Sequence, residues 1–522
     1  MEILGRNLIG FEVSEQNDKL FFAVNPFSGQ NIEPAFSAAS VQDLENAISK
    51  AQNAYLIYRK KTGEEKAVFL ETIALEIENL GDILIQRYHL ESGLAEARAM
   101  NERGRTVGQL RLFAALLREG SWVNAIIDPA QPERQPLPRP DLRSMERSLG
   151  PVAIFGASNF PLAFSVAGGD TVSALAAGCS VVFKGHPSHP GTSELVGRAI
   201  ITAAKSCGMP DGVFSLIFDE GIEIGQALVK HPAIKAVGFT GSFNGGKSIF
   251  DAANSRSEPI PVYAEMGSVN PVFVLPEILK EKGESIAAQY AASVTLGVGQ
   301  FCTNPGLMFV PKNQEFVDLL KTHAVKSQGG NLLNKNIQNS YKNGIENQKK
   351  YSDILAIGNE STGETVAQPY FLTTDFRNFC SNDALSKEVF GPSSILVQAS
   401  DMNELLEGAE KLEGHLTATV WGTPTELLQY SALLEILEQK VGRIVINGFP
   451  TGVEVCHAMV HGGPYPATTD SRTTSVGTQA ITRFTRPVCF QDMPDMLLPD
   501  ELKEGNPLKI SRKVNGKWVC YT

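Results

Sequence analysis

Short apolar runs alternate with helical stretches from residue 151 onward, and this alternation constrains the fold more than any other feature of the sequence. The candidate strands are Val152–Phe155, Val181–Lys184, Phe214–Phe218, Ala236–Thr240 and Val272–Leu275. The segments between them are long enough for crossover helices, so the pattern predicts an α/β fold with a parallel, doubly wound sheet. Ligands bind such sheets beyond the carboxyl ends of the strands. Asn159, Lys184 and Gly241 all fall at such ends.

The rest of the chain indicates further domains. A chain of 522 residues is too long for one ordinary core, so two or three domains are expected. Residues 40–116 are predicted to be helical, because Ser40 and Thr62 begin capping-box patterns ahead of amphipathic segments. The proline-rich residues 126–142 indicate an extended connection or a protruding arm, and a second α/β block is expected at roughly 270–445.

Composition and charge exclude several classes of protein. The net charge of -11 argues against a nucleic-acid partner, because phosphate binding depends on clustered Lys and Arg. The seven cysteines are scattered and include no CxxC pair, which is typical of a reduced, cytoplasmic protein. No signal peptide is visible, and Asn159 and Asp170 interrupt the longest apolar tract, so no membrane partner is expected.

The segment Gly299–Gly306 places Cys302 between glycines and a turn-forming Asn-Pro pair. A thiol with the ordinary pKa of about 8.5 is partly ionised near neutral pH and is then a good nucleophile. Flanking glycines let a ligand approach the sulfur closely. A small, unreactive core cysteine is the alternative interpretation, because most intracellular cysteines are of that kind.

A second motif, Gly241–Ser248, satisfies the P-loop pattern G-x-x-x-x-G-K-[ST] and follows a candidate strand. The acid that would bind magnesium, Asp219, precedes this loop, whereas in P-loop enzymes it usually follows. A nucleotide triphosphatase therefore stays a remote alternative. Glycines at a helix N-terminus would serve the pyrophosphate of a dinucleotide equally well.

Five motifs together resemble the aldehyde dehydrogenase superfamily, in its order and spacing, over about residues 20–490. They are Ala157–Pro161, Phe239–Ser242, Glu265–Pro271, Gly299–Cys302 and Lys387–Pro392. The resemblance implies an aldehyde dehydrogenase-like α/β fold with a Rossmann-like cofactor domain, an α/β catalytic domain and a small β arm that joins subunits into a homodimer or homotetramer. The implied divisions are 1–125 and 151–268 for the cofactor domain, 269–470 for the catalytic domain, 126–150 and 479–495 for the arm, and 496–522 for a C-terminal tail.

The same resemblance implies a reaction in which an aldehyde is oxidised to a carboxylic acid through a cysteine thiohemiacetal and thioester. Cys302 would be the nucleophile, and the Asn159 amide would stabilise the oxyanion without carrying a charge that titrates. Glu265 would activate the water that hydrolyses the thioester. Its apolar neighbours in the sequence, Val262 and Met266, are expected to raise its pKa towards neutrality.

Cofactor residues also follow from the resemblance. Glu388 and Phe390 would hold the nicotinamide ribose and ring, Gly241 and Ser242 would face the pyrophosphate, and Lys184 would bind a ribose or phosphate. NAD-preferring relatives often carry a glutamate three residues after the lysine.

In this sequence Pro187 takes the position of that glutamate, so no carboxylate there repels a 2′-phosphate. Lys184, His186 and Ser188 could bind such a phosphate. NADP is therefore the expected cofactor, with NAD also possible.

Within the family, residues 447–453, 461–464 and 470–477 resemble a bacterial subgroup that oxidises 2,5-dioxovalerate (α-ketoglutaric semialdehyde) to 2-oxoglutarate. More typical members carry a Pro-Phe-Gly-Gly segment in this region. A broad-specificity or fatty aldehyde dehydrogenase is the alternative within the class, and a catalytically inactive homologue is another.

A substrate carboxylate would suit an arginine, which can pair with it through two hydrogen bonds. The candidates are Arg105, Arg111 and Arg472, and Phe160 and Phe164 are candidate walls of the aldehyde tunnel.

His457 and His461 are spaced like two residues one helical turn apart, but they lack the Glu of H-E-x-x-H. No metal is expected to take part in the reaction. His457 is instead predicted to lie at the substrate end of the site.

Overall fold

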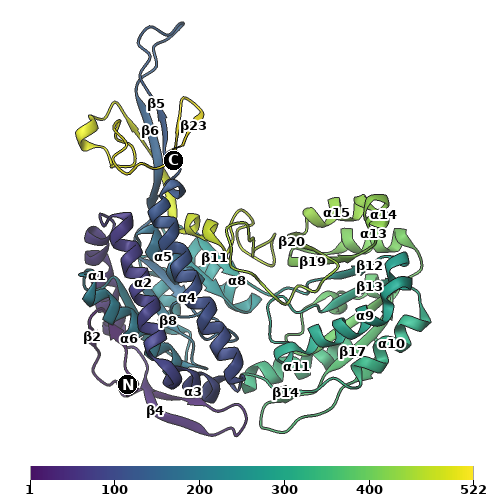
Figure 1. Cartoon of the computed structure of the whole chain (residues 1–522). Helices are drawn as coiled ribbons and strands as arrows, with labels where there is room; N and C mark the ends of the chain where they lie inside the picture. Colours follow the sequence, from purple (N-terminus) through teal and green to yellow (C-terminus); the bar gives the residue numbers. More distant parts are fainter. Residues whose placement is uncertain (1, 521–522) are drawn as a thin grey trace.

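The structure is a computed structural model that describes residues 2–520. Two seven-stranded sheets lie side by side, and a five-stranded sheet projects away from both as an arm (Figure 1). This arrangement is the α/β fold that the sequence predicts.

The first sheet carries most of the predicted strands. Its spatial order is β11 (Val262–Glu265), β10 (Ala236–Thr240), β7 (Val152–Phe155), β8 (Val181–Gly185), β9 (Phe214–Phe218), β1 (Leu8–Ile9) and β2 (Glu12–Val13). The five strands from β11 to β9 are parallel. The sequence analysis did not predict β11, the strand that ends at Glu265.

Helices cover both faces of this sheet. They are α1 (Val41–Tyr58), α2 (Gly63–Asn79), α3 (Gly81–Ser92), α4 (Glu96–Glu119), α5 (Gly169–Ala177), α6 (Pro190–Ser206), α7 (Glu223–Lys230) and α8 (Phe243–Asn254). Successive residues of a strand point to opposite faces, so Ile154 packs in the core beneath α2 to α6 and Ala153 packs in the core beneath α1, α7 and α8. Ser40 and Thr62 form the predicted capping boxes at the starts of α1 and α2.

The second sheet has the order β15 (Asp353–Ile357), β17 (Tyr370–Asp375), β18 (Ser393–Ala399), β13 (Leu307–Pro311), β12 (Val272–Val274), β19 (His415–Trp421) and β20 (Val441–Ile446). Its strands are parallel except for β15. The expectation that the run Val272–Leu275 belongs to the first sheet is wrong, because β12 pairs with β13 and β19.

Further helices surround this second sheet. They are α9 (Pro276–Thr295), α10 (Gln314–Ala324), α11 (Lys335–Gln348), α12 (Phe376–Ser381), α13 (Met402–Lys411), α14 (Pro424–Gln429) and α15 (Ser431–Glu438). Two antiparallel strand pairs form separate small sheets: β3 (Leu20–Val24) with β4 (Asn31–Ser37), and β14 (Gly330–Asn331) with β16 (Val366–Ala367).

The arm joins the proline-rich stretch to the C-terminal part of the chain (Figure 1). Its strands are β21 (Thr485–Gln491), β6 (Leu142–Ser148), β5 (Ile126–Asp128), β22 (Arg512–Val514) and β23 (Lys517–Val519). Leu498, Leu502 and Ile510 pack with Ile127 and Met145 in a small core of their own. The segment that the sequence sets apart as a tail therefore packs as part of the arm.

Among residues 2–520, no helix combines the length and the apolar character needed to cross a bilayer.

Candidate active site

Cys302 lies in the loop that follows α9 and a short 3-10 helix, η2 (Leu296–Gly299). Gly299 has a positive φ of 65°, and a Cβ at this position would lie 2.2 Å from the carbonyl oxygen of Gly391, so only glycine fits. Asn270 holds the loop from the other side, because its Nδ2 donates to the carbonyl oxygens of Cys302 and Asn304, both at 2.9 Å. The backbone around the sulfur is therefore fixed from several directions.

Glu265, at the end of β11, and Cys302 meet a third side chain, His461. The Nε2 atom of His461 lies 3.4 Å from Cys302 Sγ and 3.0 Å from Glu265 Oε1. Ser475 Oγ donates to the other carboxylate oxygen, Oε2, at 2.7 Å. The side chains of His461 and Glu265 are 0% and 1% exposed, so this contact is sealed from bulk water.

The surroundings of Glu265 act on its pKa in opposite directions. Burial raises the pKa, but the imidazole of His461 and the hydroxyl of Ser475 outweigh burial and bring the pKa down to about 2. The expectation of a pKa near neutrality is therefore wrong, because it considered only the apolar neighbours in the sequence. The pKa of the Cys302 thiol shifts upward. Burial and the Glu265 carboxylate raise this pKa, while the Arg105 guanidinium lowers it.

Asn159 follows β7 and is buried, and its Nδ2 donates to the carbonyl oxygen of Gln300 at 3.2 Å. The amide therefore lies against the loop that carries the nucleophile. Glu102 fixes the same turn, because its Oε1 accepts from the backbone N–H groups of Leu162 and Ala163 at 2.8 and 2.9 Å. Asn159 thus contacts the loop that carries Cys302, and no sequence motif indicated the role of Glu102.

Arg105, on α4, is the predicted substrate arginine that lies at this site. Its guanidinium carbon lies 5.9 Å from the ring centre of Phe160 and 5.2 Å from that of Phe164. Its Nε and Nη2 atoms are buried and have no hydrogen-bond partner among residues 2–520. Burial lowers its pKa, and the charges acting on it include Cys302 and Glu265. A buried guanidinium with free N–H groups is suited to an anionic ligand.

The other two candidate arginines lie on the surface. Arg111 pairs with Glu78 on the surface, and Arg472 is 86% exposed and pairs with Asp470. His457 is exposed, and its Nδ1 contacts the hydroxyl of Thr478. Residues 457–461 do not form a helix, so the four-residue spacing of His457 and His461 does not place them one helical turn apart.

A cleft of about 660 Å³ lies beyond the carboxyl ends of β7, β8 and β10. Its lining includes the predicted cofactor residues His186, Ser188, Gly241 and Ser242, together with Pro187 and Glu220. Ser242 caps the N-terminus of α8, where its Oγ accepts from the N–H of Gly245. A helix N-terminus and a glycine-bounded wall at the strand ends fit a dinucleotide pyrophosphate.

Two lysines near this cleft differ in their contacts. Lys184 Nζ donates to the backbone oxygen of Asp219 at 2.6 Å, and burial lowers its pKa to about 8. Lys247, the lysine of the P-loop pattern, is on the surface and pairs with Asp251 of its own helix. This placement leaves no phosphate-binding lysine in the glycine loop.

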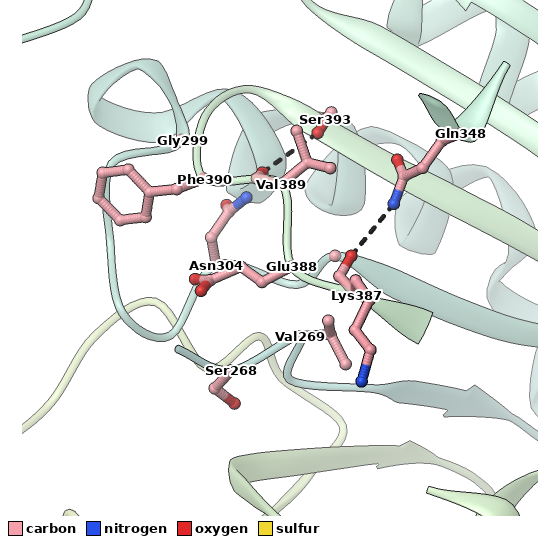
Figure 2. Close-up of a pocket in the computed structure, with 11 residues that line it drawn as sticks. Ser268, Val269, Gly299, Asn304, Gln348, Lys387, Glu388, Val389, Phe390 and Ser393 are labelled. Carbon is pink, nitrogen blue, oxygen red and sulfur yellow. Dashed lines mark hydrogen bonds between the residues drawn. The ribbon is translucent and has the colours of Figure 1, made fainter. Parts of the chain in front are cut away.

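Glu388 and Phe390 lie beside the nucleophile loop in a second, smaller pocket (Figure 2). Asn304 Nδ2 donates to the carbonyl oxygen of Gly391 at 3.3 Å, which ties the two segments together. A Cβ at Gly267 would lie 2.1 Å from Glu388 Oε2, so the glycine leaves room for this carboxylate. The predicted nicotinamide residues thus approach Cys302 from the second domain.

Together, these features are those of an oxidoreductase. A cleft at the strand ends of a doubly wound sheet suits a dinucleotide, and a cysteine, an amide and a carboxylate are held in the loop after η2, after β7 and at the end of β11. The chain matches the aldehyde dehydrogenase family over residues 13–486 and belongs to that family.

Two curated relatives are similar over nearly their whole length. The chain is 50% identical to alpha-ketoglutaric semialdehyde dehydrogenase 2 of Azospirillum brasilense, covering 99% of this chain and 100% of the relative. It is 48% identical to alpha-ketoglutaric semialdehyde dehydrogenase of Acinetobacter baylyi, covering 98% of each. Among solved structures, betaine aldehyde dehydrogenase of Staphylococcus aureus in complex with NAD+ superposes with a TM-score of 0.80 at 20% identity, over 94% of this chain and 97% of that one. At that identity the likeness concerns the fold.

The sequence analysis assigned no catalytic role to His461, Ser475 or Glu102. A signal for His461 existed, because it stands in the segment where more typical family members have Pro-Phe-Gly-Gly. Ser475 lies in the same departure from the family pattern. No sequence signal distinguishes Glu102 from a surface acid of α4.

Proposed function

We propose that this enzyme oxidises 2,5-dioxovalerate to 2-oxoglutarate with a nicotinamide cofactor. The observation that carries the choice of substrate is Arg105, a half-buried side chain beside Phe160 and Phe164 whose buried Nε and Nη2 atoms have no hydrogen-bond partner among residues 2–520. An aldehyde with a carboxylate at its far end would give this cation a partner, whereas a fatty aldehyde would leave it unpaired. The names of the two curated relatives support the same substrate.

In the proposed mechanism, the Cys302 thiol releases its proton to solvent, and Sγ adds to the aldehyde carbon and forms a thiohemiacetal. The oxyanion of this adduct would be stabilised by the Asn159 amide and the backbone N–H of Cys302. When bound, the nicotinamide supplies the acceptor for the hydride that leaves this carbon. Glu265 then takes a proton from the water that hydrolyses the thioester and, because its pKa is low, passes the proton to His461, whose Nε2 lies 3.0 Å from Glu265 Oε1. Asn159 and Cys302 hold the acyl group in place.

The residues proposed to hold the cofactor are His186, Ser188, Gly241 and Ser242, which line the large cleft, Lys184 near the end of β8, and Glu388 and Phe390 in the smaller pocket. We propose that NADP is used at least as well as NAD. Pro187 supports this preference because it places no carboxylate at the position of the family's glutamate; Glu220 is the carboxylate that does line the cleft. A comparison of kcat/KM for the two cofactors tests the proposal, and a strong preference for NAD would contradict it.

Purified enzyme should produce reduced cofactor from 2,5-dioxovalerate, measured by its ultraviolet absorbance, and the Cys302→Ser variant should not. The same assay with long-chain aldehydes separates the proposal from a fatty aldehyde dehydrogenase. Comparable kcat/KM values for 2,5-dioxovalerate and for long-chain aldehydes would contradict the proposed substrate.

We also propose that the arm joins subunits into a homodimer or homotetramer. The arm projects from the body of the molecule, and Leu137, Met496, Leu497 and Trp518 are exposed on it (Figure 1). Light scattering should give a mass of at least two chains, and a monomer at micromolar concentration would contradict the assignment. The seven free cysteines support a reducing, cytoplasmic setting.

A further inference from the structure

A single nitrogen of His461 faces both the thiol of Cys302 and the carboxylate of Glu265. The three ligand atoms, Sγ, Nε2 and one carboxylate oxygen, lie within 4.8 Å of one another. In a neutral imidazole, Nε2 is either a donor or an acceptor. It therefore cannot donate to the Glu265 carboxylate and accept from the Cys302 thiol at the same time. Three atoms with lone pairs therefore converge on one point, and a cation at that point would satisfy all of them.

The observed spacing is close to that of a zinc site. Zinc binds cysteine sulfur at about 2.3 Å, histidine nitrogen at about 2.0–2.1 Å and carboxylate oxygen at about 2.0–2.2 Å, and tetrahedral angles then place neighbouring ligand atoms roughly 3.3–3.6 Å apart. The Cys302 Sγ to His461 Nε2 distance is 3.4 Å, and the His461 Nε2 to Glu265 Oε1 distance is 3.0 Å. Small side-chain rotations would bring all three atoms into contact with one ion.

The surroundings of the cluster support the same assignment. Ser475 Oγ holds Glu265 Oε2 at 2.7 Å and leaves Oε1 for an ion, which is how groups beyond the ligands orient a metal-binding carboxylate. A divalent cation would neutralise one carboxylate and one thiolate in a buried site. Cys302 is partly exposed, which provides a route of entry. Arg105 opposes a cation, so binding should be weaker than at a structural zinc site.

We propose that Cys302, His461 and Glu265 form a three-ligand site for a thiophilic divalent cation such as zinc, and that its occupation switches the enzyme off. On binding, the Cys302 thiol releases its proton to solvent and forms a sulfur–metal bond, with no change in oxidation state. The sulfur is then no longer free to attack an aldehyde. The inhibitory part rests on the proposed role of Cys302 as nucleophile, whereas metal binding itself does not.

The test uses the full-length enzyme, stripped with a chelator and free of cofactor, and zinc chloride in a metal-buffered solution. Bound zinc per chain is measured by mass spectrometry of the metal after gel filtration. Alkylation of Cys302 by iodoacetamide is followed by peptide mass spectrometry. We expect one tight zinc per chain, protection of Cys302 from alkylation, and loss of activity that a chelator reverses.

Four variants make the test specific. Cys302→Ala should abolish the site, and Ser475→Ala should weaken zinc binding by roughly 10- to 100-fold. His461→Gln should weaken zinc binding further. The matched control His457→Gln should leave it unchanged, because His457 is exposed and its Nδ1 contacts the hydroxyl of Thr478. Circular dichroism checks the fold of each variant, and Cys302→Ala keeps the test decisive if His461→Gln does not fold.

Zinc binding that persists unchanged in Cys302→Ala, or zinc that binds without protecting Cys302, would overturn the site. An enzyme that binds zinc in this way but does not oxidise 2,5-dioxovalerate would contradict the proposed substrate and leave the metal site intact. An enzyme that oxidises 2,5-dioxovalerate and binds no zinc would contradict the metal site alone.

Discussion

Replacing Arg105 with methionine tests the proposed substrate most directly. Methionine keeps much of the length and the packing against Phe160 and Phe164, and it removes the charge and the hydrogen-bond donors. In the wild-type enzyme, Nε and Nη2 are buried and unpartnered, so both are available to a substrate carboxylate. Each hydrogen bond between charged groups contributes about 1.5–3 kcal/mol, so two would contribute about 3–6 kcal/mol.

A factor of ten in rate corresponds to about 1.4 kcal/mol, so kcat/KM for 2,5-dioxovalerate should fall at least 100-fold in Arg105→Met. Pentanal has the same number of carbons but no acid group. Its kcat/KM should change by no more than about tenfold, because Arg105 also lowers the pKa of the Cys302 thiol and this effect is common to all aldehydes. The assay is therefore the ratio of the two kcat/KM values, with Arg111→Met as the surface control.

An equal loss for both aldehydes would refute the reasoning, because it would mean that Arg105 acts on Cys302 and not on the substrate. A second readout concerns stability. Without substrate, Arg105 is a buried cation with unpaired N–H groups, which destabilises a fold. The melting temperature of substrate-free Arg105→Met should therefore equal or exceed that of the wild type, and a marked fall would indicate a structural role for the guanidinium.

Three further predictions concern other buried or cleft-lining charges. Glu220→Gln should raise kcat/KM for NADP relative to NAD by about fivefold, because a like charge leaves the cleft; an unchanged ratio would place the 2′-phosphate elsewhere. Glu102→Ala leaves the N–H groups of Leu162 and Ala163 and the hydroxyl of Tyr88 unpaired, so urea denaturation should show a loss of about 3 kcal/mol or more, and kcat should fall with it. Burial lowers the pKa of Lys66 from 10.5 to about 8. The destabilisation of the fold by the charged Lys66 is therefore fully present below pH 8 and fades as pH rises to 10.5. Lys66→Met should therefore increase the free energy of unfolding at neutral pH by roughly 3 kcal/mol, and a gain that persists at pH 11 would contradict this origin.

The features that the sequence predicted are those that local pattern determines. The strands β7, β9 and β10 have their predicted bounds, and the capping boxes of Ser40 and Thr62 form, because each depends on residues within one short segment. The motif residue Asn159 also contacts the loop that carries Cys302, through the carbonyl oxygen of Gln300.

The features that the sequence analysis missed depend on contacts between distant segments. His461 lies 196 residues from Glu265, and no local pattern shows that they pair. Local pattern also does not show which of the candidate arginines faces the site. Arg105 and Arg111 lie on one helix but roughly 120° apart around its axis, so one faces the site and the other faces Glu78.

The segment 461–475 supplies the side-chain partners of Glu265 and fixes their positions. Thr468 pairs with Glu265 as an isolated antiparallel bridge, and the N–H of Met266 donates to the carbonyl oxygen of Ala467 at 2.8 Å. The same segment contributes His461 and Ser475, which are joined by a 2.8 Å bond from the N–H of Ser475 to the carbonyl oxygen of His461. The carboxylate and both of its partners are therefore held by backbone hydrogen bonds between this segment and the end of β11. This segment therefore supplies both side-chain partners of Glu265, while β11 positions Glu265 itself, and the fold thus places a histidine beside the nucleophile.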